Sequence, residues 1–427
     1  MGMSTHPSGG PDHPGIPDDT IRPFRLEIPG EALDDLRDRL ARTRWATPLP
    51  GEPWARGVPV AYLRGLAAYW RDGYDWRTAE AAINAHPQFT TTIDGANVHF
   101  LHVRSTHDDA LPLLLCHGWP GSFVEFQRMI GPLTQPEQYG GEATDAFHVV
   151  VPSIPGFTLS GPTPDEGWTE DRIASAFVTL MHRLGYERYG AQGGDFGAGI
   201  CPAMGRLDPE RIIGVHVNAA SQGFIPWHTV EGEERESLSA LDQERLDRLG
   251  AWMAAESGYF TIQGSKPETL AAGLNDSPAG QLAWIVEKFQ GWTDPAKVLP
   301  EDAVDRDHLL TNVSLYWFTG TAGSSANLYY EGSHAGWGDV AEGGAGDGSA
   351  QAADGSSAWS AGDTGAAATG VPTGVAVFAN DVAIRRYSEG TNHITHWSDF
   401  DTGGHFAAME TPDLLTSDVR AFFRTVR

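Results

Sequence analysis

The chain has 427 residues, of which 41% are hydrophobic and 10% aromatic, so a large globular core is expected. It carries 56 Asp and Glu against 29 Lys and Arg, and the net charge of −27 argues against nucleic acid or an anionic membrane as a partner. No apolar run approaches the roughly 18 residues of a membrane-spanning helix. No group of Cys and His has the spacing of a zinc site. This composition favours a small neutral or cationic ligand and no metal ion.

The N-terminal segment differs from the rest of the chain. Residues 1–20 are polar, contain several Pro and Gly and lack the apolar core of a signal peptide, so we expect a disordered tail. Residues 21–89 are rich in aromatic side chains and predict a helical arm that wraps a larger core. Within this arm, Arg25–Ile28 has the pattern of a short strand and Ala32–Arg42 that of an amphipathic helix.

Residues 90–222 predict the first part of an α/β core. Thr90–Ile93 and Val98–Val103 flank Asp94-Gly95, which is a hairpin signal. Continuous apolar runs, typical of buried parallel strands, follow at Leu111–Cys116, Phe147–Val151 and Ile212–Val217. Helical patterns alternate with these runs, one of them capped by Thr169. The alternation predicts a mainly parallel sheet with helices on both faces.

The alternation stops after this part of the core. Residues 223–370 predict an inserted helical cap, in which Ser277 caps one helix and residues 335–370 form a low-complexity loop of Gly, Ala, Ser and Asp. Residues 371–427 predict the second part of the core, with strands at Val375–Phe378 and Ile394–Trp397 and a last helix from Pro412. An insertion at this point would cover the carboxyl ends of the strands, where sites in α/β proteins lie.

A sharp turn at residues 193–199 (Gly-Gly-Asp-Phe-Gly-Ala-Gly) is the first candidate for chemistry. Small residues around Asp195, between a short strand and a helix, have the pattern of a nucleophile elbow. An Asp there is ionised at pH 7 by its free pKa of about 3.9, and it could attack carbon directly to form an ester. The alternative is a nucleotide-binding glycine turn, but the required Gly spacing and a phosphate-binding Lys are both missing.

An ester on Asp195 would need a base that activates water. His405 follows the last predicted strand and precedes the last helix, which matches the order nucleophile, acid, His found on such sheets. Asp381 ends the strand before and is the expected orienting acid. Asp399, Asp401 and Glu410 are nearer in sequence, but we expect those loop carboxylates to be solvated.

Hydrolysis of the ester would place negative charge on its carbonyl oxygen. Two backbone N–H groups should stabilise that charge. We expect one from Phe196, at the start of the helix after the elbow, and one from Trp119 in residues 117–121 (His-Gly-Trp-Pro-Gly). The helix N-terminus adds its dipole.

Three motifs together resemble an epoxide hydrolase of the microsomal type, in the α/β-hydrolase superfamily. They are residues 117–122 (His-Gly-Trp-Pro-Gly-Ser), 193–197 (Gly-Gly-Asp-Phe-Gly) and 403–408 (Gly-Gly-His-Phe-Ala-Ala). Two further segments resemble the family's N-terminal region. They are residues 74–77 (Tyr-Asp-Trp-Arg) with Glu80, and Ile93-Asp94-Gly95 with His99-Phe100. The resemblance extends from about residue 21 to the C-terminus and implies an α/β-hydrolase fold with an epoxide and water as substrates and no cofactor.

The resemblance also implies two cap tyrosines that hydrogen-bond the epoxide oxygen. Tyr259, in Glu256-Ser257-Gly258-Tyr259, matches the first and Tyr329, in residues 324–329 (Ser-Ser-Ala-Asn-Leu-Tyr), matches the second. A neutral phenol can donate to the alkoxide that ring opening leaves. Tyr330 could exchange roles with Tyr329, and Tyr316 is a further alternative.

We therefore expect an epoxide hydrolase that converts a hydrophobic epoxide to a diol through an ester on Asp195. The alternatives are a haloalkane-type dehalogenase that uses the same Asp and a non-catalytic ligand-binding protein on this scaffold. We expect a cytoplasmic protein with no nucleic-acid or membrane partner, and a homodimer is the candidate assembly.

Overall fold

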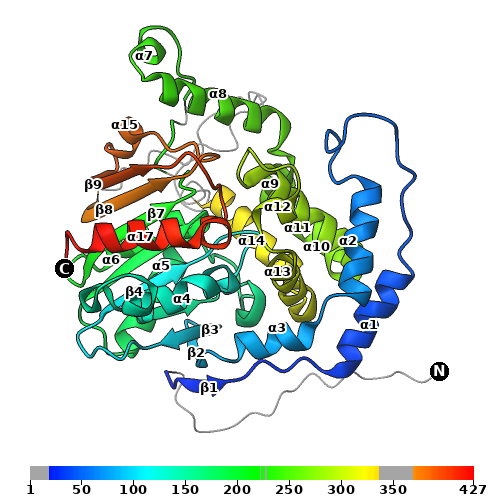
Figure 1. Ribbon diagram of the computed structural model, residues 1–427, viewed down its shortest axis with the longest axis horizontal. Coiled ribbons are helices and arrows are strands. Elements are labelled where there is room, and N and C mark those ends of the chain that lie inside the picture. The colour runs from blue at the N-terminus through cyan, green and yellow to red at the C-terminus, as the bar shows by residue number, and fades with distance from the viewer. Residues whose placement is uncertain (1–18, 222, 227, 336–368) are drawn as a thin grey trace, which may run out of the picture.

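The computed structural model describes residues 19–221, 223–226, 228–335 and 369–427. The expected N-terminal tail and most of the low-complexity loop lie outside these ranges. The described chain contains a nine-stranded sheet in the order β1-β2-β3-β5-β4-β6-β7-β8-β9 (Figure 1). Its strands are β1 (Arg22–Phe24), β2 (Gln88–Ile93), β3 (Ala96–Val103), β4 (Leu111–Cys116), β5 (Phe147–Pro152), β6 (Tyr189–Gly194), β7 (Ile212–Asn218), β8 (Thr369–Val377) and β9 (Asn392–Asp399).

The six strands from β5 to β9 in the sheet order run parallel, and β1, β2 and β3 form an antiparallel edge next to β5. The apolar run of β4 explains its central position. Leu113 and Leu115 pack into one hydrophobic cluster while Leu114 and Cys116 pack into the other, so both faces of the strand are buried. Cys116 and Cys201 are free, buried thiols.

Helices cover both faces of the sheet. α5 (Glu170–Arg183) and α6 (Phe196–Leu207) pack on one face, and α4 (Gln127–Thr134) and α17 (Pro412–Phe423) on the other. The predicted cap of α5 is confirmed, because the Thr169 side chain accepts a hydrogen bond from the Arg172 N–H. The short helices around these elements are η1 (Phe123–Phe126), η2 (Pro136–Tyr139), η3 (Ala143–Asp145), η4 (Thr158–Ser160), α15 (Arg385–Ser388) and α16 (Ala407–Glu410).

The predicted hairpin at Asp94-Gly95 is confirmed, with Ile93 paired to Ala96. The predicted strand at Arg25–Ile28 is wrong, because the strand lies three residues earlier, at Arg22–Phe24. Pairing with Gln88–Thr90 of β2 sets that position. The following backbone instead bonds to side chains of the arm: Leu26 N–H donates to Asn84 and Ile28 N–H to Glu80.

The described part of the chain between β7 and β8 contains helices and no strand. Ser277 caps one of these helices, since its hydroxyl accepts from the Gly280 N–H. Figure 1 shows the group beside the sheet and reaching over it. Its members are α7 (Gly232–Glu236), α8 (Ala240–Ala255), α9 (Gly258–Ser265), α10 (Pro267–Asp276), α11 (Pro278–Trp292), α12 (Pro300–Ala303), α13 (Arg306–Thr319) and α14 (Ala322–His334). We refer to α7–α14 as the cap.

The N-terminal arm consists of α1 (Gly30–Ala41), α2 (Val60–Asp72) and α3 (Trp76–Ile83). In Figure 1, α1 and α2 lie along α10 and α11, and α3 lies beneath α13. The indole of buried Trp70 donates to the Ser314 hydroxyl at 2.9 Å, and Tyr74 bonds to Thr311. The arm thus fastens the cap to the edge of the sheet that starts at β1.

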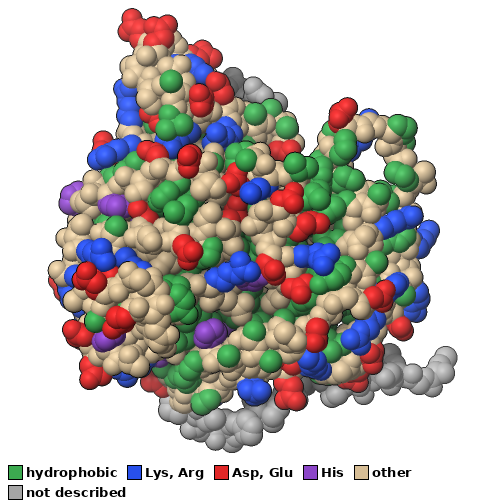
Figure 2. Space-filling model, viewed as in Figure 1, with side chains coloured by type: hydrophobic (Ala, Val, Ile, Leu, Met, Phe, Trp, Pro, Cys, Tyr) green, Lys and Arg blue, Asp and Glu red, His purple; other side chains and the backbone are tan. Residues whose placement is uncertain are grey.

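The charged side chains on the face shown in Figure 2 are mostly interspersed, with red and blue groups side by side over the helices. An acidic tip stands out over α7, whose sequence is Gly-Glu-Glu-Arg-Glu. Across the described ranges, no helix combines the length and apolar character needed to cross a bilayer.

Candidate active site

Asp195 occupies a strained turn between β6 and α6. Its backbone angles are φ 57° and ψ −121°, a conformation that residues other than Gly rarely adopt. The neighbouring glycines make the turn feasible, because a Cβ on Gly193 would lie 2.4 Å from the Gly197 carbonyl oxygen. A Cβ on Gly197 would lie 2.2 Å from the Cys116 carbonyl oxygen. The elbow predicted from this glycine pattern is present.

Backbone donors surround the Asp195 carboxyl group. The Trp119 N–H donates to Oδ1 at 2.8 Å, and the Phe196 N–H also donates to the carboxylate. Gly118 allows this approach, since a Cβ there would lie 2.2 Å from Oδ1. The two N–H groups expected from the sequence therefore meet at one carboxyl group, at the N-terminus of α6.

Burial changes the acidity of this carboxyl group. It raises the pKa of Asp195 to about 7, although the N–H groups of Trp119 and Phe196 act in the opposite direction. The expectation that Asp195 ionises like a free side chain is therefore wrong. The side chain is 22% exposed, and it lines an internal cavity.

His405 lies on the other side of the carboxyl group. Its Nε2 is 3.4 Å from Asp195 Oδ2, and its backbone N–H donates to the Trp292 carbonyl at 2.9 Å. The Trp292 ring also packs against the imidazole, with 4.8 Å between the ring centroids. Burial lowers the pKa of His405 to about 3, so the imidazole is neutral at pH 7 and can accept a proton.

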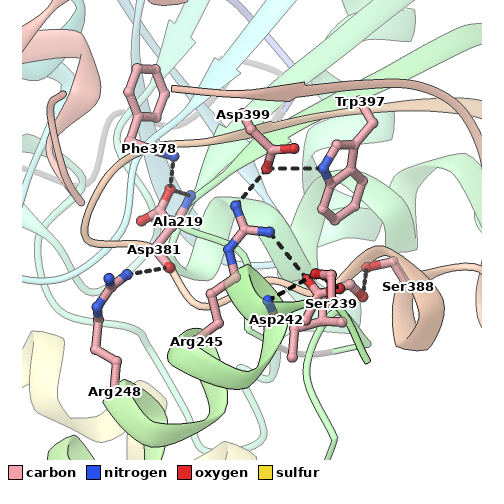
Figure 3. A network of polar contacts seen from close by, with 11 residues as sticks. Ala219, Ser239, Asp242, Arg245, Arg248, Phe378, Asp381, Ser388, Trp397 and Asp399 are labelled. Carbon is pink, nitrogen blue, oxygen red and sulfur yellow. Dashed lines mark hydrogen bonds and ion pairs between the residues drawn. The ribbon is translucent and has the colours of Figure 1, made fainter. Parts of the chain in front are cut away.

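Asp381 lines the same cavity as Asp195 and His405. Figure 3 shows its carboxyl group against the backbone N–H groups of Phe378 and Ala219. Its Oδ2 accepts from the Phe378 N–H at 3.0 Å and the Ala219 N–H at 3.2 Å. Burial raises its pKa to about 6, against these two donors. Among the described residues no hydrogen bond joins Asp381 to His405, so the structure places the pair in one cavity without direct pairing.

The three other acidic residues near His405 have different surroundings. Asp399 is exposed and binds Arg245, and Asp401 is also exposed. The expectation of a solvated carboxylate is wrong for Glu410, which accepts from the Asp294 N–H at 2.8 Å and the Phe406 N–H at 3.0 Å. Glu410 thus holds the backbone around His405 in place, and burial raises its pKa to about 8.

A cavity that is partly open to solvent lies in front of Asp195, and its wall is mostly apolar. Tyr259 and Tyr329 both line it, and their rings contact the Trp119 indole, the first by stacking at 5.2 Å and the second edge-on at 5.7 Å. Burial and the charge of Asp195 are among the causes that raise the pKa of both phenols, so each remains a hydrogen-bond donor.

The two alternative tyrosines lie elsewhere. The Tyr316 hydroxyl donates to the Gly121 carbonyl oxygen at 2.6 Å and is fully buried. Tyr330 is 38% exposed and stacks on His334. Of the four candidates, Tyr259 and Tyr329 are thus the pair that lines the cavity.

Several cavity residues were missed from the sequence. Trp252, Phe260 and Trp292 supply much of the aromatic wall, and Arg248 brings a positive charge to it. Tyr259 contacts Trp252 and Trp292, and Tyr329 contacts Phe260. The sequence signal was the high aromatic content alone, because these side chains come from different helices of the cap.

The fold and this site define an α/β-hydrolase, with a strained residue at a strand-to-helix turn that faces a cavity under a helical cap. The family model described as the alpha/beta hydrolase fold matches residues 112–253, and the model described as the epoxide hydrolase N terminus matches residues 21–126. The chain belongs to the epoxide hydrolases of the microsomal type, and it is therefore an enzyme.

Three relatives support this assignment over nearly the whole chain. A Stigmatella aurantiaca protein assigned to the epoxide hydrolases is 44% identical, over 95% of this chain and 86% of its own length. Epoxide hydrolase 1 of Sus scrofa is 34% identical, over 95% of this chain and 89% of its own. The solved structure of Aspergillus niger epoxide hydrolase superposes with a TM-score of 0.78 at 32% identity, covering 96% of this chain and 97% of that one.

Proposed function

We propose that Asp195 attacks a carbon atom of the epoxide and that His405 activates the water that releases the diol. The observation that carries this proposal is the arrangement around Asp195. The Trp119 N–H donates to Oδ1, the Phe196 N–H also interacts with the carboxyl group, and His405 Nε2 lies 3.4 Å from Oδ2. Such an arrangement serves both the formation and the hydrolysis of an ester.

In the first step Asp195 Oδ2 forms a bond to the epoxide carbon while the ring C–O bond breaks. The ring oxygen takes up negative charge and receives a proton from Tyr259 or Tyr329, which line the cavity above the carboxylate. The product is a hydroxyalkyl ester of Asp195 and a tyrosinate. Oδ1 becomes the ester carbonyl oxygen and keeps the Trp119 N–H as its donor.

In the second step His405 accepts a proton from water, and the water oxygen adds to Cγ of Asp195. The negative charge goes to Oδ1, where the Trp119 and Phe196 N–H groups stabilise it. The bond between Cγ and Oδ2 then breaks, and the leaving diol oxygen receives the proton from His405. The remaining proton of Asp195 returns to the tyrosinate. In this proposal Asp381 stabilises the imidazolium of His405 by its charge across the shared cavity.

We further propose a hydrophobic epoxide, such as an aryl or terpenoid one, as the substrate. Apolar and aromatic side chains supply most of the cavity wall, and their burial against a ligand would favour binding by roughly 25 cal/mol per Å² of apolar surface. The wall includes Ile225, Leu249, Trp252, Phe260 and Trp292. The paired phenols favour an epoxide over a halogenated alkane, because they can protonate an alkoxide.

Two substitutions and an isotope experiment test the mechanism. Asp195→Asn should lower turnover of trans-stilbene oxide by at least about 10⁴-fold, and His405→Gln should accumulate the ester because hydrolysis slows by about 10²- to 10⁴-fold. Mass spectrometry of the quenched enzyme would detect the adduct on the peptide that contains Asp195. In a single turnover in ¹⁸O-water the label should enter Asp195, and label in the diol alone would contradict the ester route.

A further inference from the structure

A second, smaller cavity also borders the Asp195 carboxyl group. Its free volume is about 10 Å³, close to the space that one water molecule needs. All of its lining residues belong to the core and none to the described cap, so it lies on the core side of Asp195. The large cavity and this small one share only Asp195 and His405 among their lining residues. Its other lining residues are Gly118, Trp119, Gly121, Glu125, Phe126, Gly194, Asn218, Phe406 and Ala408.

Glu125 places a carboxyl group at this small cavity. It is only 9% exposed, and its carboxyl group has one donor, the Ser122 N–H. Among the described residues, no side chain pairs with it. A Cβ on Gly121 would lie 1.5 Å from Glu125 Oε1, so a glycine is required at position 121 to leave room for this carboxyl group.

Asn218 provides a second polar group. It is 4% exposed, and its Oδ1 accepts from Gln192 at 2.8 Å. Its amide nitrogen has no acceptor within the described chain. Buried polar groups without protein partners are typically satisfied by water, and a cavity of this size and polarity can hold one.

The chemistry of the second half-reaction requires a water molecule at such a position. Once the ester has formed, the hydroxyalkyl group occupies the large cavity on the side of Oδ2. The attacking water must still reach both Cγ of Asp195 and Nε2 of His405. The small cavity borders both residues and is separate from the space that the alkyl group fills.

We propose that Glu125 is a further catalytic residue, whose carboxyl group holds the hydrolytic water in the small cavity between Asp195 and His405. This inference rests on the proposed ester mechanism. The water donates one hydrogen to His405 Nε2 and the other to a carboxyl oxygen of Glu125, so that a lone pair of its oxygen faces Cγ. The first proton passes to His405 as the oxygen–carbon bond forms, and Glu125 exchanges no proton.

The electrostatics of Glu125 agree with this role. Burial raises the pKa of Glu125 well above its ordinary range, and the charge of the free Asp195 carboxylate adds to this effect, so the neutral form is favoured. A neutral carboxyl group offers an acceptor to the water without adding a second negative charge beside the nucleophile. It therefore does not repel the charge that develops on Oδ1 during hydrolysis.

The test separates the two half-reactions with trans-stilbene oxide as the probe. Rapid-quench mass spectrometry would measure ester formation and ester decay in the wild type, Glu125→Gln and Glu125→Met. Gln keeps the shape and an acceptor oxygen, while Met keeps only the length. We expect ester formation within about twofold of wild type in both variants. Decay should slow by about tenfold to hundredfold in Glu125→Met and by less than about fivefold in Glu125→Gln.

Gly121→Ala provides an independent variant that leaves Glu125, Asp195 and His405 in place. The added methyl group would displace the Glu125 carboxyl group from its position. It should slow ester decay as Glu125→Met does, and Gly121→Ala should have no further effect in a Glu125→Ala background. Decay at the wild-type rate in Glu125→Met would overturn the proposal, and so would equal losses in formation and decay in Glu125→Met.

The wild-type measurement keeps the two proposals distinguishable. If the wild type turns over the epoxide without any ester on Asp195, the ester mechanism itself fails. If the ester forms and decays normally in the wild type and equally fast in every variant of Glu125 and Gly121, only the role of Glu125 is wrong.

Discussion

At the scale of single residues, the Asp195 carboxyl group is controlled by two opposing effects. Burial under the aromatic cavity disfavours its charged form, while the backbone N–H groups of Trp119 and Phe196 favour it. The resulting pKa of about 7 places the titration of the nucleophile in the physiological range. His405 does not titrate there, because burial lowers its pKa to about 3.

This difference predicts the pH dependence of the first half-reaction. A raised pKa means that the carboxylate is lost as pH falls through about 7, so the rate constant of ester formation should fall about tenfold per pH unit below it. Ester decay should stay flat from pH 7 to 9, where His405 is neutral and Asp381 is charged, and it should slow as pH falls through the Asp381 pKa of about 6. Single-turnover measurements from pH 5 to 9 would check both. A formation rate that is constant down to pH 5 would contradict the prediction.

The sequence could predict Asp195 because its requirements are local. A strained turn needs small neighbours at fixed positions, and Gly193 and Gly197 supply them. Glu125 could not be recognised in the same way, because its burial and its position beside Asp195 arise only when β4 and β6 lie side by side. The nearest local signal was Gly121, whose small size leaves space for the carboxyl group of Glu125.

At the scale of elements, α8 connects the cap to the loop that carries Asp381. Figure 3 shows Arg245 and Arg248 projecting from this helix toward the loop. Arg245 binds Asp399 and Asp242, and Arg248 donates to the Asp381 carbonyl oxygen at 3.0 Å. Both guanidinium groups also lower the pKa of the Asp381 carboxyl group, against the larger effect of burial.

We therefore expect Arg248→Met to reduce the ionised fraction of Asp381 while the side chain itself stays in place. The pKa of Asp381 should rise, because a nearby positive charge is lost. Ester decay should then slow by about threefold to tenfold at pH 6 and recover at higher pH, since about 1 kcal/mol of interaction is involved. The control is Arg235→Met, which removes an exposed ion pair with Asp247 in the same region. If both variants behave alike, Arg248 has no specific effect on Asp381.

Most elements could be predicted, since long apolar runs and capped helices are specified locally. The strands β4, β5 and β7 agree with their sequence patterns within a residue, and the helices α5 and α11 begin directly after their predicted caps, Thr169 and Ser277. Two strands differ. β8 begins at Thr369, six residues before its predicted start at Val375, and β1 is a three-residue edge strand whose place is set by its pairing with β2. Short edge strands depend on a partner that is distant in sequence, so their local pattern carries little information.

At the scale of the whole molecule, the arm joins parts that the sequence does not connect. Trp70 and Tyr74 bond to α13 of the cap, while Glu80 of the same arm accepts from Ile28 beside β1. The cap in turn supplies Tyr259 and Tyr329 to the cavity. The sequence predicted an arm that wraps the core, but the contacts of Trp70 and Tyr74 with α13 span more than 230 residues, and no local pattern specifies them.

Trp70 offers the most direct test of this bracing role. It is 2% exposed, so Trp70→Ala should lower the stability of the fold by about 3–5 kcal/mol through the lost packing. Trp70→Phe keeps an aromatic ring but leaves the buried Ser314 hydroxyl without its indole donor, which costs about 1–3 kcal/mol. Arg39→Met removes an exposed ion pair between the arm and Asp276 of the cap, and it should cost less than about 1 kcal/mol.

The thermal unfolding midpoint, followed by tryptophan fluorescence, should therefore fall most in Trp70→Ala, less in Trp70→Phe and least in Arg39→Met. The cap carries both tyrosines. The rate of ester formation in Trp70→Ala should therefore collapse at a lower temperature than the same rate in Arg39→Met. Equal midpoints for Trp70→Ala and Arg39→Met would mean that the arm contacts the cap without stabilising it. The contacts between the arm and the cap would then add nothing to the free energy of unfolding.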